Sequence, residues 1–255
     1  MKLLIDAGNT RIKWALVDET AAALGAWLAS GAVMHADAAR LGGDWQAALA
    51  ALPGRSVRGV LAANVAGAGV RENLERMLAA VPGLSTLVIE WFASVPERAG
   101  LRNGYRNPGQ LGCDRFAAAI GAHALAPGRP IIVANCGTAT TIDAVTAGGV
   151  FLGGMILPGL GLMATSLARN TAQLPQIAQD ATLSAGFADN TDDAILSGCL
   201  AAQAGAIERA FTLHGASECI ISGGAAPYIA RTLALPHRHI ENIVMIGLHA
   251  AARSA

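Results

Sequence analysis

Two short turns in this sequence combine glycine with small polar side chains, a composition suited to binding phosphate. The first turn is Asp6-Ala7-Gly8-Asn9-Thr10, between two apolar runs that favour strands. Backbone N–H groups and hydroxyls in such a turn can surround polyphosphate oxygens, while Asp6 could hold Mg²⁺ and Lys13 could add positive charge. The second turn contains Gly137 and Thr138 and also follows an apolar run. Two ordinary hairpins stabilised by Asn and Gly would look the same, so both interpretations stay open at this point.

A third segment that could do chemistry contains the acidic residue Asp114. It follows Gly112, which permits a tight turn, and it begins a stretch of helical character that continues from Arg115 to Leu125. N–H groups at the start of a helix stabilise a carboxylate, so Asp114 fits a helix N-cap with Arg115 as its surface neighbour. For Asp114 alone, this capping interpretation is the simpler one.

Two common nucleotide-binding motifs do not fit the chain. A Walker A loop needs lysine after glycine, but the only lysines, Lys2 and Lys13, do not follow glycine. The run Gly159-Leu160-Gly161-Leu162-Met163-Ala164 matches the glycine pattern of dinucleotide-binding proteins, and Asp180 lies near the expected distance. However, Gln173 to Ser184 lacks the apolar strand that should end at this acid. The sequence therefore disfavours an NAD oxidoreductase.

The elements that would position these residues form a repeated pattern. Short apolar runs alternate with helical stretches, which indicates an α/β fold, and near Pro130 a second series of strands begins. Gly8 and Gly137 are 129 residues apart, about half of the 255-residue chain. At this offset Asp6 corresponds to Asn135. We therefore expect duplication of a β-β-β-α unit.

The composition of the chain argues against several classes of protein. Hydrophobic residues make up 53% of the chain and charged residues 14%, which excludes a disordered protein. The 18 basic and 18 acidic residues give no net charge, so a dedicated nucleic-acid partner is not expected. The four cysteines have no paired spacing, which favours reduced thiols and a cytoplasmic location. The uncharged segment from Ala144 to Ala168 contains several glycines and Pro158, so we expect a buried strand with glycine-rich turns and no membrane span.

Four motifs in their order along the chain resemble those of type III pantothenate kinases, a family that includes the Bordetella accessory factors. The resemblance extends from residue 6 to about residue 248 and so covers nearly the whole chain. The motifs are Asp6-Ala7-Gly8-Asn9-Thr10, Gly112-Cys113-Asp114-Arg115, Cys136-Gly137-Thr138-Ala139-Thr140 and Gly153-Gly154-Met155-Ile156-Leu157-Pro158-Gly159.

The resemblance implies an α/β fold of the actin-like, sugar-kinase superfamily, with two duplicated ribonuclease-H-like halves. This agrees with the internal repeat. The expected N-terminal half covers residues 1–113 and contains the phosphate-binding hairpin. The expected C-terminal half covers residues 114–255 and contains a dimer interface, and its last helix could pack back on the N-terminal half.

The resemblance also implies an activity, the ATP-dependent phosphorylation of pantothenate in the first step of coenzyme A synthesis. Asp114 would be the general base for the pantothenate hydroxyl. Thr138 would contact ATP, and Asp6 would lie near Mg²⁺, directly or through water. The other residues expected to bind ATP are Ala7, Gly8, Asn9, Thr10, Arg11, Ile12 and Lys13.

The resemblance assigns further residues to pantothenate and to a homodimer. Tyr105, Gly112, Cys113 and Arg115 would shape the pantothenate site together with Asp114. Thr191 matches a family threonine that binds pantothenate near the dimer interface. Many members of the family have an acid where this chain has Asn135, and that acid holds K⁺ or NH₄⁺. Because an amide carbonyl is neutral, this departure weakens the expectation of a monovalent cation at Asn135.

Two other functions compete with pantothenate phosphorylation. The first is a regulatory accessory protein in transcription, which the family name suggests but which does not require Asp6, Asp114, Arg115 and Thr138 together. The second is a kinase for another small hydroxylated substrate. The motifs for ATP do not separate such kinases, whereas the Tyr105 to Arg115 segment and Thr191 favour pantothenate.

Overall fold

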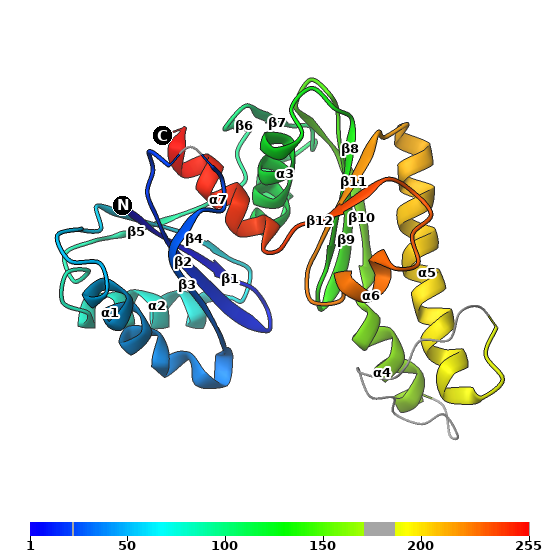
Figure 1. Cartoon of the computed structure of the whole chain (residues 1–255), viewed down its shortest axis with the longest axis horizontal. Helices are drawn as coiled ribbons and strands as arrows, with labels where there is room; N and C mark the ends of the chain where they lie inside the picture. Colours follow the sequence, from blue (N-terminus) through cyan, green and yellow to red (C-terminus); the bar gives the residue numbers. More distant parts are fainter. Residues whose placement is uncertain (22, 171–186, 255) are drawn as a thin grey trace. The chain divides into compact units, whose positions relative to one another are not determined.

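The protein forms two compact units in a computed structural model that describes residues 1–21, 23–170 and 187–254 (Figure 1). The first unit contains Met1–Pro127, Gly149–Phe151 and Ile243–Ala255, and the second contains Gly128–Gly148 and Leu152–Asn242. Asp180 and the segment from Gln173 to Ser184, which the dinucleotide interpretation needed, lie outside the described residues.

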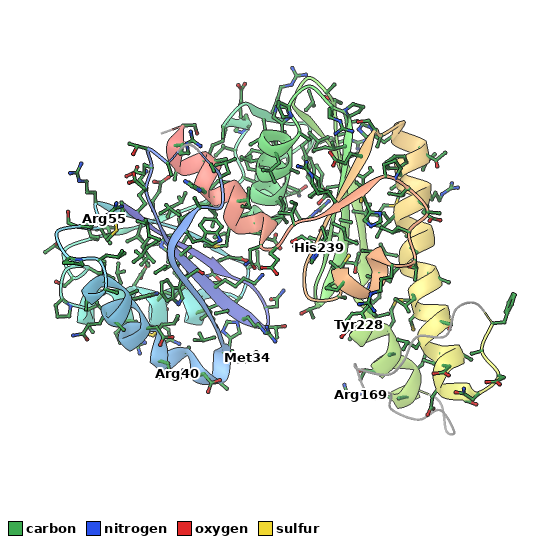
Figure 2. All side chains as sticks on the ribbon, viewed as in Figure 1. Met34, Arg40, Arg55, Arg169, Tyr228 and His239 are labelled. Carbon is green, nitrogen blue, oxygen red and sulfur yellow. The ribbon has the colours of Figure 1, made fainter. Side chains whose placement is uncertain are left out.

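The first unit is built on a five-stranded sheet. β1 is antiparallel to β2 and parallel to β4, while β2 is antiparallel to β3 and β4 is parallel to β5. The strand order is β3 (Trp27–Met34), β2 (Arg11–Val17), β1 (Lys2–Ala7), β4 (Gly59–Asn64) and β5 (Ile89–Trp91). Figure 2 labels Met34, the last residue of β3, which pairs with Arg11 at the start of β2.

Both faces of this sheet are buried. Leu3 and Ile5 of β1 share one core with Trp45 and Leu74. Trp45 belongs to α1 (Leu41–Ala50), which follows the 3-10 helix η1 (His35–Arg40), and Leu74 belongs to α2 (Ala68–Ala80). Because side chains alternate along a strand, Leu4 and Asp6 lie on the opposite face. On that face α7 (Ile243–Arg253) contacts β1, and α3 (Cys113–Leu125) contacts β4.

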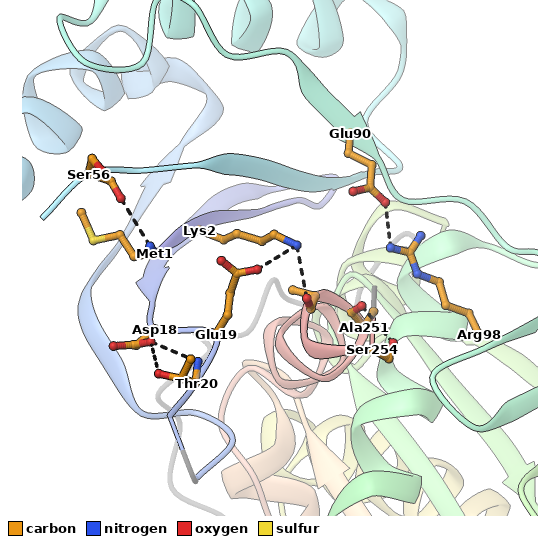
Figure 3. A network of polar contacts seen from close by, with 11 residues as sticks. Met1, Lys2, Asp18, Glu19, Thr20, Ser56, Glu90, Arg98, Ala251 and Ser254 are labelled. Carbon is orange, nitrogen blue, oxygen red and sulfur yellow. Dashed lines mark hydrogen bonds and ion pairs between the residues drawn. The ribbon is translucent and has the colours of Figure 1, made fainter.

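Helices α3 and α7 pack closely because each has a glycine at the contact. A Cβ on Gly121 would lie 2.7 Å from the Gly247 nitrogen, and a Cβ on Gly247 would overlap the Ala117 carbonyl. The end of α7 is also tied to β1, since Lys2 Nζ donates to the Ala252 carbonyl at 3.2 Å and pairs with Glu19 at 3.1 Å (Figure 3). These contacts fix α3 against the first sheet.

The second unit repeats the topology of the first. β8 is antiparallel to β9 and parallel to β11, and β11 is parallel to β12. The strand order is β12 (His237–His239), β11 (Glu218–Ser222), β8 (Ile131–Cys136), β9 (Ala139–Val145) and β10 (Val150–Pro158). Thus β8 corresponds to β1, β9 to β2, β10 to β3, β11 to β4 and β12 to β5. The expected duplication is confirmed, and Asp6 and Asn135 hold equivalent positions one residue before the end of their strands.

In the described part of the second unit, three helices accompany the sheet. They are α4 (Leu160–Asn170), α5 (Thr191–His214) and α6 (Ala226–Ala230), and α5 contacts β8, β9 and both other helices. The uncharged segment from Ala144 to Ala168 forms the end of β9, β10 and most of α4. In the described parts of the chain, no helix combines the length and apolar character needed to cross a membrane.

A short hairpin in the first unit precedes α3. β6 (Glu97–Arg98) is antiparallel to β7 (Leu101–Asn103), and the 3-10 helix η2 (Pro108–Gln110) follows. β7 pairs with Val150 and Phe151, the part of β10 that belongs to the first unit. Helix α3 therefore lies in the first unit, whereas the halves expected from the sequence are divided before Asp114.

Candidate active site

The β1–β2 hairpin presents a tight turn at the end of the first sheet. Asp6 pairs with Lys13 across the two strands, and the Gly8 N–H donates to the Arg11 carbonyl at 3.1 Å. Asn9, Thr10 and Arg11 are exposed. The turn thus has a fixed base and a solvent-facing tip, as the phosphate-binding interpretation requires.

Asp6 is a buried carboxylate with only 7% of its surface exposed. Burial raises its pKa to about 6, Lys13 opposes the rise, and the charge of Asp114 adds to it. A nearby cation would therefore stabilise the ionised form of Asp6.

Asp114 occupies the first turn of α3, but it is not the N-cap that the sequence suggested. Gly112 is the N-cap, and Asp114 Oδ1 accepts from the Arg115 N–H at 2.8 Å. The carboxylate lies so close to Gly112 that a Cβ there would be 2.7 Å from Asp114 Oδ1. Burial raises the pKa of Asp114, while this hydrogen bond and the Arg115 charge oppose the rise. The carboxylate is therefore available for chemistry other than capping.

Asn64 connects the start of α3 to the ends of β1 and β4. It is the last residue of β4 and is aligned with Ala7, and its carbonyl accepts from Cys113 Sγ at 3.6 Å. Its side chain holds the next turn, because Oδ1 accepts from the Ala66 N–H at 2.8 Å and Nδ2 donates to the Gly67 carbonyl at 2.9 Å. Since Asp6 precedes Ala7 and Asp114 follows Cys113, this junction brings the two carboxylates together. Burial raises the Cys113 pKa, so its thiol stays protonated.

Arg115 forms a buried cluster with two aromatic residues of the first unit. Its guanidinium Nη1 donates to the Tyr105 hydroxyl at 2.9 Å. The guanidinium carbon lies 5.7 Å from the Tyr105 ring centre and 5.8 Å from that of Phe151. The two rings meet edge to face at 5.6 Å. Arg115 is 7% exposed, so it is not the surface neighbour that the capping interpretation assumed.

Asn103 positions Tyr105 and was not among the residues that the sequence singled out. Its Oδ1 accepts from the Tyr105 N–H at 3.1 Å, and its Nδ2 donates to the Pro108 carbonyl at 3.2 Å. The side chain is 7% exposed, which is unusual for an asparagine. A polar residue that ends a short strand just before Gly104 was the only signal for it in the sequence.

Thr138 lies in the β8–β9 hairpin of the second unit, the counterpart of the first turn. The Gly137 N–H donates to the Ala139 carbonyl at 2.9 Å, and the Gly159 N–H donates to the Thr138 carbonyl at 2.9 Å. Gly159 has no room for a side chain, since a Cβ would overlap the Gly137 carbonyl. Gly223 similarly approaches the Cys136 carbonyl. Glycine thus lets three loops of this unit meet at the carboxyl end of β8.

Two other predicted residues also belong to the second unit. Asn135 is aligned with Thr141 on β9 and with Ser222 on β11. Thr191 is exposed and begins α5, whose N-cap is Asn190. The structure therefore brings Asp6, Cys113, Asp114, Arg115 and Tyr105 together in the first unit, while Thr138, Asn135 and Thr191 lie in the second.

Asp6 and Asp114 suit a divalent metal that has few protein ligands and completes its coordination with water and phosphate oxygens. Among the described residues, no cluster of three or more His, Cys, Asp or Glu side chains could form a metal cage. Asp6 and Asp114 are a pair of carboxylates, the protein ligands that Mg²⁺ commonly uses together with water and substrate phosphates. The buried charge of Asp6 fits such an ion.

Comparisons with known proteins show which family the chain matches. The family model for type III pantothenate kinase matches residues 2–212. A type III pantothenate kinase from Janthinobacterium sp. (strain Marseille) is 55% identical over 260 residues, with 99% of this chain and 97% of the relative covered.

Solved structures of low identity share the fold. A Campylobacter jejuni protein named for the Baf family of transcriptional activators is 18% identical, with a TM-score of 0.57 over 96% of this chain and 94% of that one. A glucokinase from an Antarctic psychrotroph is 14% identical, with a TM-score of 0.53 over 100% of this chain and 99% of that one. The expected actin-like, sugar-kinase fold with duplicated halves is thus confirmed. The chain belongs to the type III pantothenate kinase family.

Proposed function

We propose that this protein transfers the γ-phosphoryl group of ATP to the primary hydroxyl of pantothenate, giving 4′-phosphopantothenate in the first step of coenzyme A biosynthesis. The observation that carries the proposal is the closeness of Asp6 and Asp114: the charge of Asp114 acts on Asp6, and Cys113 beside Asp114 contacts Asn64, which is aligned with Ala7 beside Asp6. Phosphoryl transfer needs an oriented hydroxyl and neutralised phosphate charge more than covalent help from the protein.

Asp114 is the general base in this proposal. Its carboxylate accepts from the Arg115 N–H and is suited to accept the proton of a substrate hydroxyl as well. Asp6 holds Mg²⁺, directly or through water, and the ion supplies charge neutralisation to the phosphates of ATP. The rise of the Asp6 pKa through burial supports this role, because a bound cation removes the cost of keeping that carboxylate ionised.

ATP phosphates bind the β1–β2 hairpin in this proposal. The segment from Ala7 to Ile12 surrounds the phosphates, with backbone N–H groups at its exposed tip around Asn9, and Lys13, aligned with Asp6, supplies positive charge. Thr138 contacts ATP from the equivalent hairpin of the second unit. Its support is the repeated topology, which gives each unit the same strand–turn–strand at the same edge of its sheet.

Pantothenate lies beside Asp114 in a site shaped by Tyr105, Gly112, Cys113 and Arg115. A guanidinium is well matched to a carboxylate such as that of pantothenate, and Tyr105 holds Arg115 in place. Gly112 keeps space free next to Asp114. Thr191, exposed at the start of α5, is proposed to contact pantothenate as in the family pattern.

Activation by K⁺ or NH₄⁺ is expected to be weak. Asn135, the counterpart of Asp6 in the second unit, offers a neutral amide oxygen in place of a carboxylate. A neutral ligand attracts a monovalent cation less strongly than a charged one. We therefore assign no metal ligand at Asn135.

The active form is proposed to be a homodimer that uses exposed apolar side chains of β10 and α4. These side chains are Leu152, Met155, Ile156, Leu162 and Leu167, among them Leu152 at 52% and Ile156 at 64% exposure. Exposed apolar clusters mark association sites. Ile156→Asp should shift the dimer to monomer in light scattering, whereas Val88→Asp, at an exposed valine of the first unit, should not.

The proposed location is the cytoplasm, where ATP is available and thiols stay reduced. All four cysteines are free, and three are buried.

Purified protein with ATP and Mg²⁺ tests the function directly. ADP formation is measured with pantothenate and with a panel of other small alcohols, each with and without K⁺, and the product is identified by mass spectrometry. We expect turnover with pantothenate and little dependence on K⁺. Turnover with another alcohol alone would indicate a different kinase. No turnover with any alcohol, under either salt condition, would favour the regulatory accessory protein.

A further inference from the structure

His35 lies directly beside the phosphate-binding hairpin, although no motif in the sequence includes it. It follows Met34, the last residue of β3, which is aligned with Arg11 at the start of β2 (Figure 2). Because of this register, the chain that leaves β3 passes close to the tip of the hairpin. The imidazole is partly buried there, and its Nε2 lies 2.8 Å from the Gly8 carbonyl oxygen.

The hydrogen bond fixes the direction of one peptide group in the turn. A carbonyl oxygen only accepts, so Nε2 carries the proton and donates it. The accepting carbonyl belongs to the peptide between Gly8 and Asn9, which is trans. In a planar trans peptide the C=O and N–H point in opposite directions. Holding the Gly8 carbonyl on the side of His35 therefore turns the Asn9 N–H away from His35.

A glycine turn has particular need of such a restraint. Glycine is the most flexible residue in the backbone, and Asn9 and Thr10 at the tip are exposed. The Gly8 N–H is already used by the Arg11 carbonyl at 3.1 Å, which closes the base of the turn. His35 restrains the next peptide, so two successive peptide groups have defined directions before any ligand binds. Preorganised N–H groups bind anions more tightly than mobile ones, because less ordering is left for the binding step.

We propose that His35 is a positioning residue for ATP, which aims the Asn9 N–H at the nucleotide phosphates by holding the Gly8 carbonyl. This inference rests on the phosphate-binding role of the hairpin in the proposed function. It assigns His35 no proton transfer and no contact with pantothenate.

Three variants separate the hydrogen bond from the bulk of the side chain. His35→Ala removes both, His35→Phe keeps a ring without a donor, and His35→Gln supplies a new donor of similar reach. His214 provides a matched control, because its Nε2 lies 2.9 Å from the Val145 carbonyl, in the second unit. His214→Ala therefore removes the same kind of bond away from the hairpin.

The full-length protein is titrated with ATP and Mg²⁺ by calorimetry without pantothenate, and the KM of each substrate is then measured. We expect His35→Ala and His35→Phe to weaken ATP binding and to raise the KM for ATP about threefold to tenfold, the range of one net hydrogen bond. The KM for pantothenate should stay within about twofold. His35→Gln should recover most of the affinity for ATP, and His214→Ala should match the wild type.

Several results would overturn the proposal. His35→Phe could bind ATP as tightly as the wild type, His35→Gln could fail to recover affinity while remaining folded by circular dichroism, or both KM values could rise together. If the wild-type protein binds ATP but does not phosphorylate pantothenate, the proposed function fails while the role of His35 is still decided by the titration. If the wild type binds no ATP, both fail.

Discussion

The charge of Asp114 acts on Asp6, adding to the rise of the Asp6 pKa that burial causes. One carboxylate comes from β1 and the other from α3, and they meet because Asn64 and Cys113 join the end of β4 to the start of α3. Two ionised carboxylates in one buried site repel each other unless a cation binds near them or one of them is protonated. The arrangement costs folding free energy and is therefore better explained by function than by stability.

Asp114→Asn should lower kcat for pantothenate phosphorylation by a factor of about 10² to 10⁴, the usual contribution of general acid–base catalysis. The amide keeps the shape of the side chain and can still accept from the Arg115 N–H, so KM values should change little. Steady-state kinetics checks this.

Asp44→Asn is the matched control, since Asp44 lies in the first turn of α1, as Asp114 does in α3. This control should keep wild-type kcat. Wild-type turnover in Asp114→Asn would show that Asp114 is not the base.

Gly247→Ala should destabilise the protein by about 1–3 kcal/mol, because its Cβ would overlap the Ala117 carbonyl of α3. The free energy of unfolding in urea measures this loss. Since α3 carries Asp114, any shift of the helix that relieves the overlap should also lower kcat.

Gly205→Ala in α5 is the control, because a Cβ there meets no atom within 4 Å. Alanine favours a helix over glycine, so this variant should gain up to about 1 kcal/mol. An equal gain in Gly247→Ala would mean that the two helices can move apart freely.

Lys2→Met should lower the free energy of unfolding by about 0.5–1.5 kcal/mol. It removes the donor to the Ala252 carbonyl at the end of α7 and the pair with Glu19 (Figure 3). A cation near the last carbonyls of a helix also interacts favourably with its dipole. Urea unfolding at low and high salt separates the hydrogen bond to Ala252 from the ion pair with Glu19 and the helix-dipole effect, because salt screens mainly the last two.

Arg55→Met tests whether any surface ion pair has the same effect. The pair of Arg55 with Asp18 is more exposed, at 47% and 38%, and its loss should cost no more than about 1 kcal/mol. If both variants lose the same amount, the bond to Ala252 has no special importance.

Local patterns in the sequence predicted much of the fold. Alternating apolar runs indicated the strands, and glycine with small polar residues indicated both hairpins. The offset between Gly8 and Gly137 predicted the duplicated sheets, which the matching strand orders confirm. Such features depend on neighbouring residues, so one chain is enough to find them.

The parts that could not be predicted depend on contacts between distant segments. Nothing near Gly121 indicates that it packs against Gly247, and nothing near Asn64 indicates that it receives Cys113. His35 reaches Gly8 only through the pairing of β3 with β2. The N-cap interpretation of Asp114 was wrong for a related reason. Gly112 is the N-cap and leaves space for the Asp114 carboxylate, and Arg115 lies on the buried side of α3.

His249 should make the protein less stable in acid. The imidazole is fully buried in α7, where Nδ1 accepts from the Gly25 N–H at 3.3 Å and the ring lies 5.7 Å from that of Trp27. Burial lowers its pKa below the ordinary value of 6.5, and the Arg253 charge adds to this, whereas a hydrogen bond with the Asp18 backbone opposes it.

The direction of this pH effect follows from the number of protons that the folded and the unfolded protein bind. Below about pH 6.5 the unfolded chain binds a proton at His249 that the folded protein does not, so acid favours unfolding. Asp6, whose pKa burial raises to about 6, takes up a proton in the folded protein over the same range and opposes this loss in the wild type and in each variant. Between pH 7.5 and pH 5.5 the free energy of unfolding should therefore fall more, or rise less, in the wild type than in His249→Gln, whose amide oxygen can still accept from Gly25. Some dependence should remain, because burial also lowers the pKa of His123. His237→Gln, at an exposed histidine of β12, should keep the full wild-type dependence. Equal slopes in the wild type and His249→Gln would show that His249 is protonated alike in both states.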